Sequence, residues 1–150
     1  MSTREAIRAV VTRRFHASAN RVFDAWLNRE MIDQWMFGPA VRDEEIIHLS
    51  LTARVGGSFS FLVEREGEEL EYVGKYLEIS RPCRLVFTWT VATEPVGSRV
   101  IVEIEPGQTG CEVTLTHELH PSCAEQVGRT EETWSKMFDA LAPVLAKSDS

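Results

Sequence analysis

The chain has 150 residues, of which 43% are hydrophobic and 26% charged, a composition typical of a folded globular protein and not of a disordered one. Its length fits one domain over residues 1–150, long enough to bury a core without disulfide or metal support. Asp and Glu number 23 against 16 for Lys and Arg. The net charge of −7 repels phosphate and excludes nucleic acid and anionic membranes as expected partners.

The cysteines and the N-terminal sequence indicate the cellular compartment. Cys83, Cys111 and Cys123 share no C-x-x-C spacing, which is typical of a reducing compartment. The N-terminal stretch MSTREAIRAVVTRRF has no long apolar run and does not have the pattern of a signal peptide. No segment approaches the roughly 18 apolar residues of a membrane span. We therefore expect a cytoplasmic protein.

The segment that ends at Gly38-Pro39 has the pattern of a strand followed by two short helices. In order, we expect a strand over residues 7–16, a helix capped by Ser18 and a shorter helix capped by Asn28. Val22 and Trp26 are four residues apart and share one face of the first helix. Pro39 disfavours helical geometry at Gly38, so the second helix ends there.

Beyond Pro39 the hydrophobic period changes from helical to strand-like, and short turns separate six expected strands. These are VRDEEIIHLS (41–50), SFSFLV (58–63), LEYVGKYLEIS (70–80), RLVFTWTVA (84–92), SRVIVEIE (98–105) and CEVTLTHEL (111–119). An acidic hairpin tip is expected around Gly67, and Gly74 inside its strand predicts a bulge or a close approach of another chain segment. The short turns favour a meander of antiparallel neighbours.

The longest helix is expected from about Cys123 to Lys147. Its stripe, spaced three and four residues apart, consists of Val127, Glu131, Trp134, Phe138, Leu141 and Leu145. Pro143 is expected to kink the last turns. The fold class is α+β: a curved antiparallel sheet of about seven strands wraps around this helix, with the two short helices inserted between strands 1 and 2.

A curved sheet that grips a helix leaves room for a small molecule, and the residues expected to face inward are bulky. They are Trp35, Phe37, Phe59, Phe61, Phe87, Trp89, Trp134 and Phe138. Such side chains either fill the interior or form the wall of a cavity, and their identity alone does not decide between the two.

Three polar residues are candidate anchors for a guest in that space. Glu131 interrupts the apolar stripe, so it faces water, a partner charge or a polar guest; the alternative is a position at the wet end of the helix. His117 lies on the apolar face of the last strand and is either a hydrogen-bonded core histidine or a pocket anchor. The hydroxyl group of Tyr72 is directed toward the same space in this interpretation.

Motifs for metal, nucleotide or nucleophilic chemistry are absent from the sequence. His117 and His120 of HELH are three residues apart on an expected strand, so they point to opposite faces and predict no zinc site. There is no P-loop and no G-x-S-x-G elbow. We therefore expect no metal or cofactor and assign no catalytic residue.

Five segments in order, RVFDAWLNREMIDQWMFGP, RVGGSFSF, YVGKYLEISRPCRLVFTW, VTLTHEL and ETWSKMFDALAPVL, carry a family resemblance from about Ala19 to Leu145. The chain resembles the homologues of the activator of heat-shock protein 90 ATPase, within the START-like, Bet v-like helix-grip superfamily. The resemblance implies a hydrophobic cavity between sheet and long helix. Thr133 stands where many relatives have a glycine before the helix tryptophan. No segment of the sequence resembles the additional amino-terminal domain that contacts the chaperone in the protein for which the family is named, so we do not expect a co-chaperone role on this ground.

Three functions remain open from the sequence. The first is binding of a hydrophobic small molecule at the eleven residues named above as inward-facing or as anchors. The second is an enzyme of cyclase or hydrolase type that uses Glu131 or His117 as acid or base in the same cavity. The third is an interaction module, co-chaperone-like or homodimeric, with an apolar patch near Met31, Met36 and Phe37.

Overall fold

The computed structural model describes residues 7–36, 45–91, 98–119 and 125–147 of the chain, and the account below is confined to them. Phe37, one of the expected pocket residues, lies outside these ranges.

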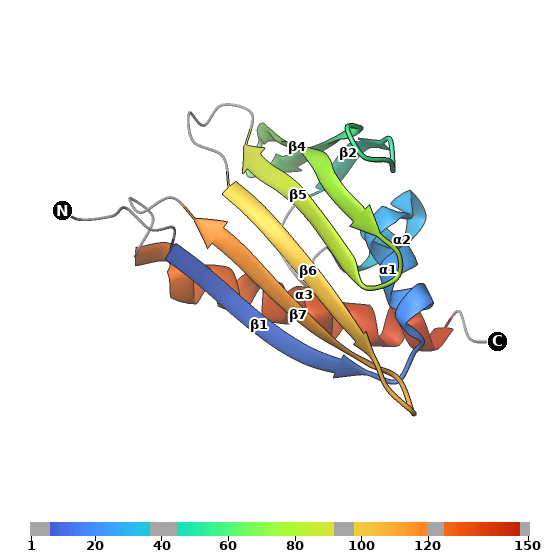
Figure 1. The fold of residues 1–150 in the computed structure, drawn as a ribbon. Helices are drawn as coiled ribbons and strands as arrows, with labels where there is room; N and C mark the ends of the chain where they lie inside the picture. Colours follow the sequence, from blue (N-terminus) through green and yellow to red (C-terminus); the bar gives the residue numbers. More distant parts are fainter. Residues whose placement is uncertain (1–6, 37–44, 92–97, 120–124, 148–150) are drawn as a thin grey trace.

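The elements follow the predicted order (Figure 1). They are β1 (Ile7–Phe15), α1 (Ala19–Leu27), α2 (Arg29–Trp35), β2 (Glu45–Leu51), β3 (Ser58–Arg65), β4 (Glu68–Ser80), β5 (Arg84–Val91), β6 (Ser98–Pro106), β7 (Cys111–Leu119) and α3 (Val127–Lys147). Both expected caps are present, because the side chains of Ser18 and Asn28 accept the backbone N–H groups of Arg21 and Met31, each at 3.2 Å.

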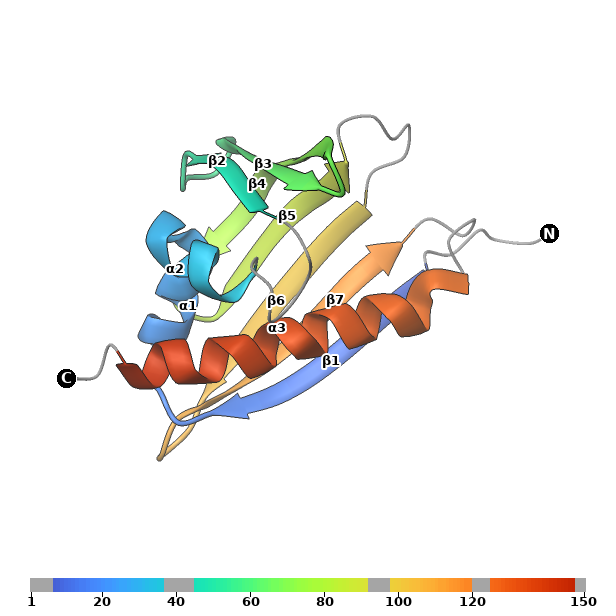
Figure 2. The ribbon, with the colours of Figure 1, turned by 180° about the vertical axis from the view of Figure 1, so that it is seen from behind.

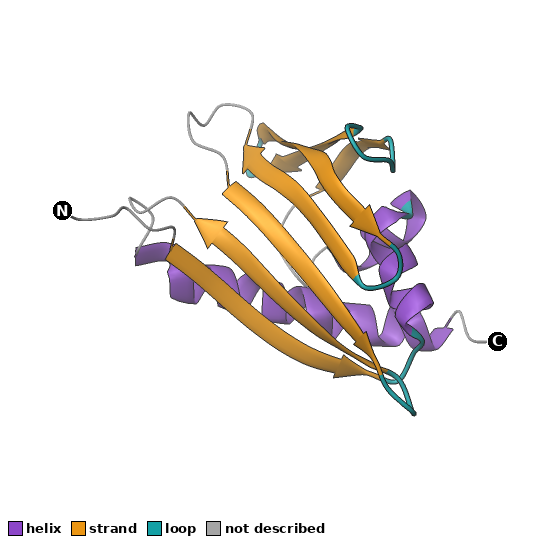
Figure 3. Ribbon diagram, in the orientation of Figure 1, coloured by secondary structure: helices purple, strands orange, loops and turns teal. Residues whose placement is uncertain are grey.

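One antiparallel sheet of seven strands runs in the order β1-β7-β6-β5-β4-β3-β2 (Figure 3). Strands β2 to β7 form the expected meander, and β1 closes the other side by pairing with β7 along its whole length. The position of β1 follows from no local sequence signal, since it pairs with residues about a hundred positions away. The sheet therefore ends in two edge strands, β1 and β2.

The helices cover the concave face of this sheet in two groups (Figure 2). Helix α3 lies along β1, β7 and β6, while α1 and α2 lie beside its C-terminal end, beneath the part of the sheet formed by β2 to β4. This is the α+β helix-grip arrangement that the sequence predicts.

The C-terminal helix buries only its second part. Its buried residues are Trp134, Met137, Phe138, Leu141, Val144 and Leu145, whereas no described residue of its first two turns is buried. The helix continues past Pro143 to Lys147. Pro143 is exposed, so the backbone acceptor that lacks its amide partner, the carbonyl of Asp139, lies on the solvent side. The guanidinium of Arg21 donates to the carbonyl of Leu145 and so binds the end of α3 to α1.

Gly74 marks a close approach, one of the two outcomes expected for it. A Cβ atom at this position would lie 2.0 Å from the backbone oxygen of Thr88 and 2.5 Å from the ring of Phe59, its partner on β3. The register shift of β4 occurs farther along, between Tyr76 and Glu78. The glycine thus lets the Phe59 ring pack flat against the β4 backbone.

We expect Gly74→Ala to lower the free energy of unfolding by about 1 to 3 kcal/mol, because the new methyl group would meet a backbone oxygen that has no room to move. Urea denaturation measures the change. Gly128→Ala is the matched control: nothing lies within 4 Å of its added Cβ, and alanine favours the helix, so stability should stay equal or rise. Equal stability of the Gly74→Ala and wild-type proteins would contradict this account of the β4 backbone.

Candidate functional site

Aromatic side chains fill the interior beneath α3. Trp26 is at the centre, with its ring centroid 4.7 Å from that of Trp35, 5.7 Å from Trp134 and 6.2 Å from both Phe87 and Phe138. Each of these five side chains is at most 3% exposed. Spacings of this size are those of directly packed aromatic rings. Trp35, Phe87 and Phe138, three of the predicted ligand-binding residues, therefore all pack against Trp26 in the core.

A second aromatic group lies on β3, β4 and β5 and joins the first through Trp89. Phe59 stacks on Phe61 at 4.8 Å, and Tyr72 stacks on Trp89 at 5.1 Å. Trp89 in turn lies 6.2 Å from Trp134. Trp89 is only half-buried, so this end of the core reaches the surface.

His117 connects the two pocket tryptophans through a chain of hydrogen bonds. The indole Nε1–H of Trp134 donates to Nδ1 of His117 over 3.0 Å. Nε2 of His117 lies 2.7 Å from the hydroxyl of Ser98, which donates its own proton to the backbone oxygen of Trp89, also over 2.7 Å. Because that hydroxyl proton is already committed, His117 must donate from Nε2 and accept at Nδ1. The histidine is thus neutral, with its tautomer fixed by its neighbours.

Burial reinforces the neutral state. His117 is 5% exposed, and desolvation lowers its pKa from 6.5 to about 4. Protonation would place a second proton on Nδ1, where the indole of Trp134 already points its N–H group. Protonation of His117 would therefore break its hydrogen bond with Trp134.

A pocket of about 160 Å³ opens where these residues meet the first turns of α3. It is lined by Trp89, His117, Arg129, Thr130, Thr133, Trp134 and Met137. An engineered protein cavity of similar volume, about 150 Å³, holds one benzene molecule. The walls are apolar and aromatic, while the arginine and the two threonine hydroxyl groups supply polarity, the usual pattern of a small-molecule site.

Glu131 lies on the other shoulder of α3, toward β1. Its Oε2 accepts the backbone N–H of Val10 over 2.9 Å. One and two turns farther along, Ser135 and Asp139 accept from the guanidinium of Arg13 at 3.0 and 2.7 Å. The Glu131 contact occupies one backbone donor on the outer edge of β1, which would otherwise be free to pair with another strand, and the Arg13 contacts join α3 to the same strand. The carboxylate that interrupts the apolar stripe therefore protects a sheet edge.

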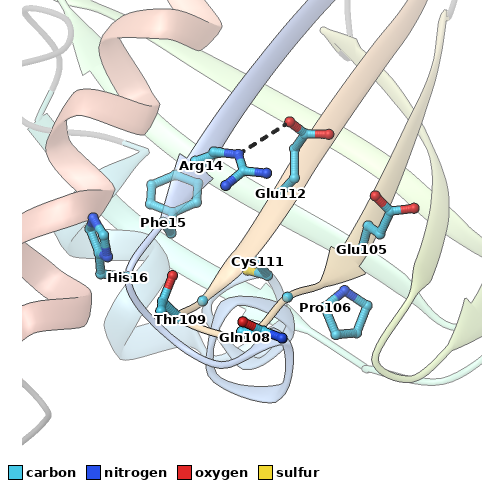
Figure 4. A pocket seen from close by; sticks show the side chains of 11 residues that line it. Arg14, Phe15, His16, Glu105, Pro106, Gln108, Thr109, Cys111 and Glu112 are labelled. Carbon is cyan, nitrogen blue, oxygen red and sulfur yellow. Dashed lines mark ion pairs between the residues drawn. The ribbon is translucent and has the colours of Figure 1, made fainter.

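A larger hollow, about 380 Å³, lies at the far end of the sheet, where the β6–β7 hairpin meets the end of β1 (Figure 4). Figure 4 shows the ion pair between Arg14 on β1 and Glu112 on β7, which both line this hollow. Their charged groups are 3.6 Å apart. Burial raises the pKa of the Cys111 thiol there, which disfavours the reactive thiolate. The smaller pocket is the stronger candidate site because aromatic walls, a hydrogen-bonded histidine and a cation converge on it.

Among the described residues, no three His, Cys, Asp or Glu side chains come together as ligands for a metal ion. Within the same ranges, no helix has the length and apolar character needed to cross a membrane.

The structure brings together only some of the residues expected at the site. Trp89, His117 and Trp134 line the pocket. The other described candidates lie in the aromatic core, except for Glu131 of α3, whose carboxylate binds the backbone of β1. Sequence reasoning missed five participants, namely Ser98, Arg129, Thr130, Thr133 and Met137. Thr130, Trp134 and Met137 are spaced four and three residues apart, which was a usable signal for a second face of the helix.

Comparison with known proteins gives one family and many similar folds. The sequence profile of the family described as Activator of Hsp90 ATPase homolog 1-like protein matches residues 16–146. No curated protein matches the sequence.

Several solved structures have the same fold. A protein from Rhodobacter sphaeroides has a TM-score of 0.83 at 17% identity over 99% of both chains. A protein of unknown function from Staphylococcus aureus also reaches 0.83, at 16% identity over 96% of each chain. A protein from Nitrosomonas europaea reaches 0.81, at 18% identity over 95% of this chain and 96% of its own. At these identities the likeness shows the fold alone.

We expect the stability of the protein to fall between pH 6.5 and pH 4 by about 3 kcal/mol through His117. Its pKa is lower in the folded than in the unfolded state, so the unfolded chain binds more protons in this interval. The contribution is complete above pH 6.5 and is lost as pH falls through about 4. Urea denaturation across this range should give a shallower profile for His117→Gln, which cannot titrate; carboxylates affect both proteins alike. Identical slopes would contradict a buried neutral histidine.

We expect Glu131→Ala to expose the edge of β1. The amide of Val10 should exchange with deuterium faster by about tenfold, and stability should fall by at most about 1 kcal/mol, because the lost hydrogen bond lies at the surface. Glu131→Gln is the control, since its carbonyl oxygen can still accept from Val10 and should keep the exchange slow. Unchanged exchange of Val10 in Glu131→Ala would contradict this role.

Proposed function

The chain belongs to the family of Activator of Hsp90 ATPase homolog 1-like proteins, and from this premise we propose that it is a helix-grip domain that binds a small apolar molecule. The site is the pocket between Trp89 on β5 and the first turns of α3. One observation carries the proposal. The pocket has aromatic walls, and it lies beside the first two turns of α3, where none of the described residues is buried.

The walls of the pocket are held in place before any ligand arrives. Trp134 is fixed by its hydrogen bond to His117, and the backbone of Trp89 is fixed through Ser98. A site whose side chains are already ordered loses little conformational entropy on binding. The indole rings offer flat faces to a ring or a short alkyl chain, and Met137 supplies an adaptable thioether.

The size of the pocket sets the expected affinity. Burying a single ring removes on the order of 100 Å² of apolar surface from water, worth about 3 kcal/mol. A single-ring fragment should therefore bind weakly, with a dissociation constant on the order of 10 mM. A larger ligand would need the aromatic core around Trp26 to move. The indole Nε1 of Trp26 is buried without a hydrogen-bond partner among the described residues, so it would gain an acceptor from a guest that reached it.

Binding fits the geometry better than catalysis does. Both ring nitrogens of His117 are engaged in hydrogen bonds, and a pKa of about 4 makes it a weak base. Glu131, the other candidate acid or base, has its carboxylate on the amide of Val10. Of the apolar patch expected for an interaction module, Met36 is only 3% exposed, Met31 is half-buried, and Phe37 lies outside the described residues.

We expect toluene and phenol to shift the indole N–H signals of Trp134 and Trp89 and the methyl signal of Met137 in NMR titrations. Thr133→Phe should abolish these shifts, because its ring would occupy the pocket from a half-exposed position that tolerates bulk. The control is Lys136→Phe, which adds the same ring to an exposed position of α3 outside the pocket.

Two results would overturn the proposal. One is the absence of any shift at the pocket signals with either probe at tens of millimolar. The other is equal binding by wild type and Thr133→Phe, which would place the bound probe elsewhere.

A further inference from the structure

The cation at the pocket has no acidic partner among the described residues. Arg129 is exposed at the rim of the pocket. Its backbone oxygen accepts a hydrogen bond from the hydroxyl of Thr133 at 3.0 Å. Its guanidinium forms no ion pair with any described Asp or Glu. The hydroxyl of Thr130, beside it, likewise has no hydrogen bond to a described residue.

This isolation is unusual for the protein, whose net charge is −7. Most arginines of the described strands form an ion pair with a glutamate or an aspartate, for example Arg84 with Glu103 at 2.7 Å. Glu125 and Glu132 lie four residues before and three residues after Arg129 in the sequence, and neither forms an ion pair with it. Glu131 binds the amide of Val10, Glu132 lies 4.0 Å from Lys136, and Glu118 pairs with Arg99 at 2.6 Å. A cation kept free of partners next to an apolar pocket is suited to an anionic ligand.

We propose that the pocket takes a small carboxylic acid with one aromatic ring or a short alkyl chain. The inference rests on the proposed function and adds the ligand's charge to it. The apolar part lies between Trp89 and Trp134, and the carboxylate lies at the rim with Arg129 and the hydroxyl of Thr130. A guanidinium presents paired N–H donors that match the two oxygens of a carboxylate.

The volume and the charge both favour this class. About 160 Å³ holds one ring, which leaves the acid group outside, at the arginine. A phosphate dianion would need more than one cation in a protein with so much negative charge. A carboxylate needs only one, and its neutral amide has the same size and shape. The pair of ligands therefore isolates the contribution of charge.

The experiment compares phenylacetate with phenylacetamide on the full chain, by NMR titration of the indole signals of Trp89 and Trp134. We expect phenylacetate to bind about fivefold more tightly at low salt, as for a partly exposed ion pair of about 1 kcal/mol. Arg129→Gln should bring this ratio close to one while leaving phenylacetamide binding unchanged. The control Arg54→Gln removes the same charge from an exposed residue outside the pocket and should preserve the ratio.

The outcomes separate this inference from the proposed function. If both probes bind equally, or if Arg129→Gln leaves the ratio unchanged, the preference for an anion is wrong and the apolar site stands. If the ratio falls equally in Arg54→Gln, the effect is due to net charge and the assignment to Arg129 is wrong. If neither probe moves the indole signals, the proposed function itself fails.

Discussion

The structure depends on the packing of α3 into the concave face of the sheet, centred on Trp26. That indole contacts aromatic rings from α2, α3 and β5, so three elements that are distant in the sequence pack on one buried side chain. Seven strands in one twisted sheet cannot bury their inner face against one another, and a helix must supply the second layer. The aromatic rings span the space that the curvature leaves. In this structure the aromatic rings therefore fill much of the space in which such a fold could bind a ligand.

A chain of hydrogen bonds inside this apolar layer runs from Trp134 through His117 and Ser98 to the backbone of Trp89. Each donor has an acceptor, so burial costs little free energy while the histidine stays neutral. The same contacts that stabilise the core also hold the pocket walls. Stability and the shape of the site are thus coupled through a single imidazole. A substitution of His117 is therefore expected to alter both the free energy of unfolding and the pocket walls.

Local chemistry made much of the fold predictable. Ser18 and Asn28 are good caps, and strict alternation placed Phe59 and Phe61 on the buried face. What local chemistry could not decide was which of two opposite outcomes each large side chain takes. Trp35 and Phe138 fill the core and Trp89 lines the pocket, because packing depends on distances between elements that no local pattern encodes. Glu131 was noticed as an exception to the stripe. Its spacing to Ser135 and Asp139, four residues each, was the overlooked sign of a polar shoulder along β1.

The two polar sides of α3 have different roles. On one, Glu131 binds the amide of Val10 at the edge of β1, and Ser135 and Asp139 bind the guanidinium of Arg13. On the other, Arg129, Thr130 and Thr133 line the pocket with no acid among them. Because an acid near Arg129 would repel an anionic ligand, the separation of charge across the helix matters as much as the arginine itself. The polar positions of an amphipathic helix thus serve two purposes here: one side protects an edge, and the other keeps a cation free beside an apolar pocket.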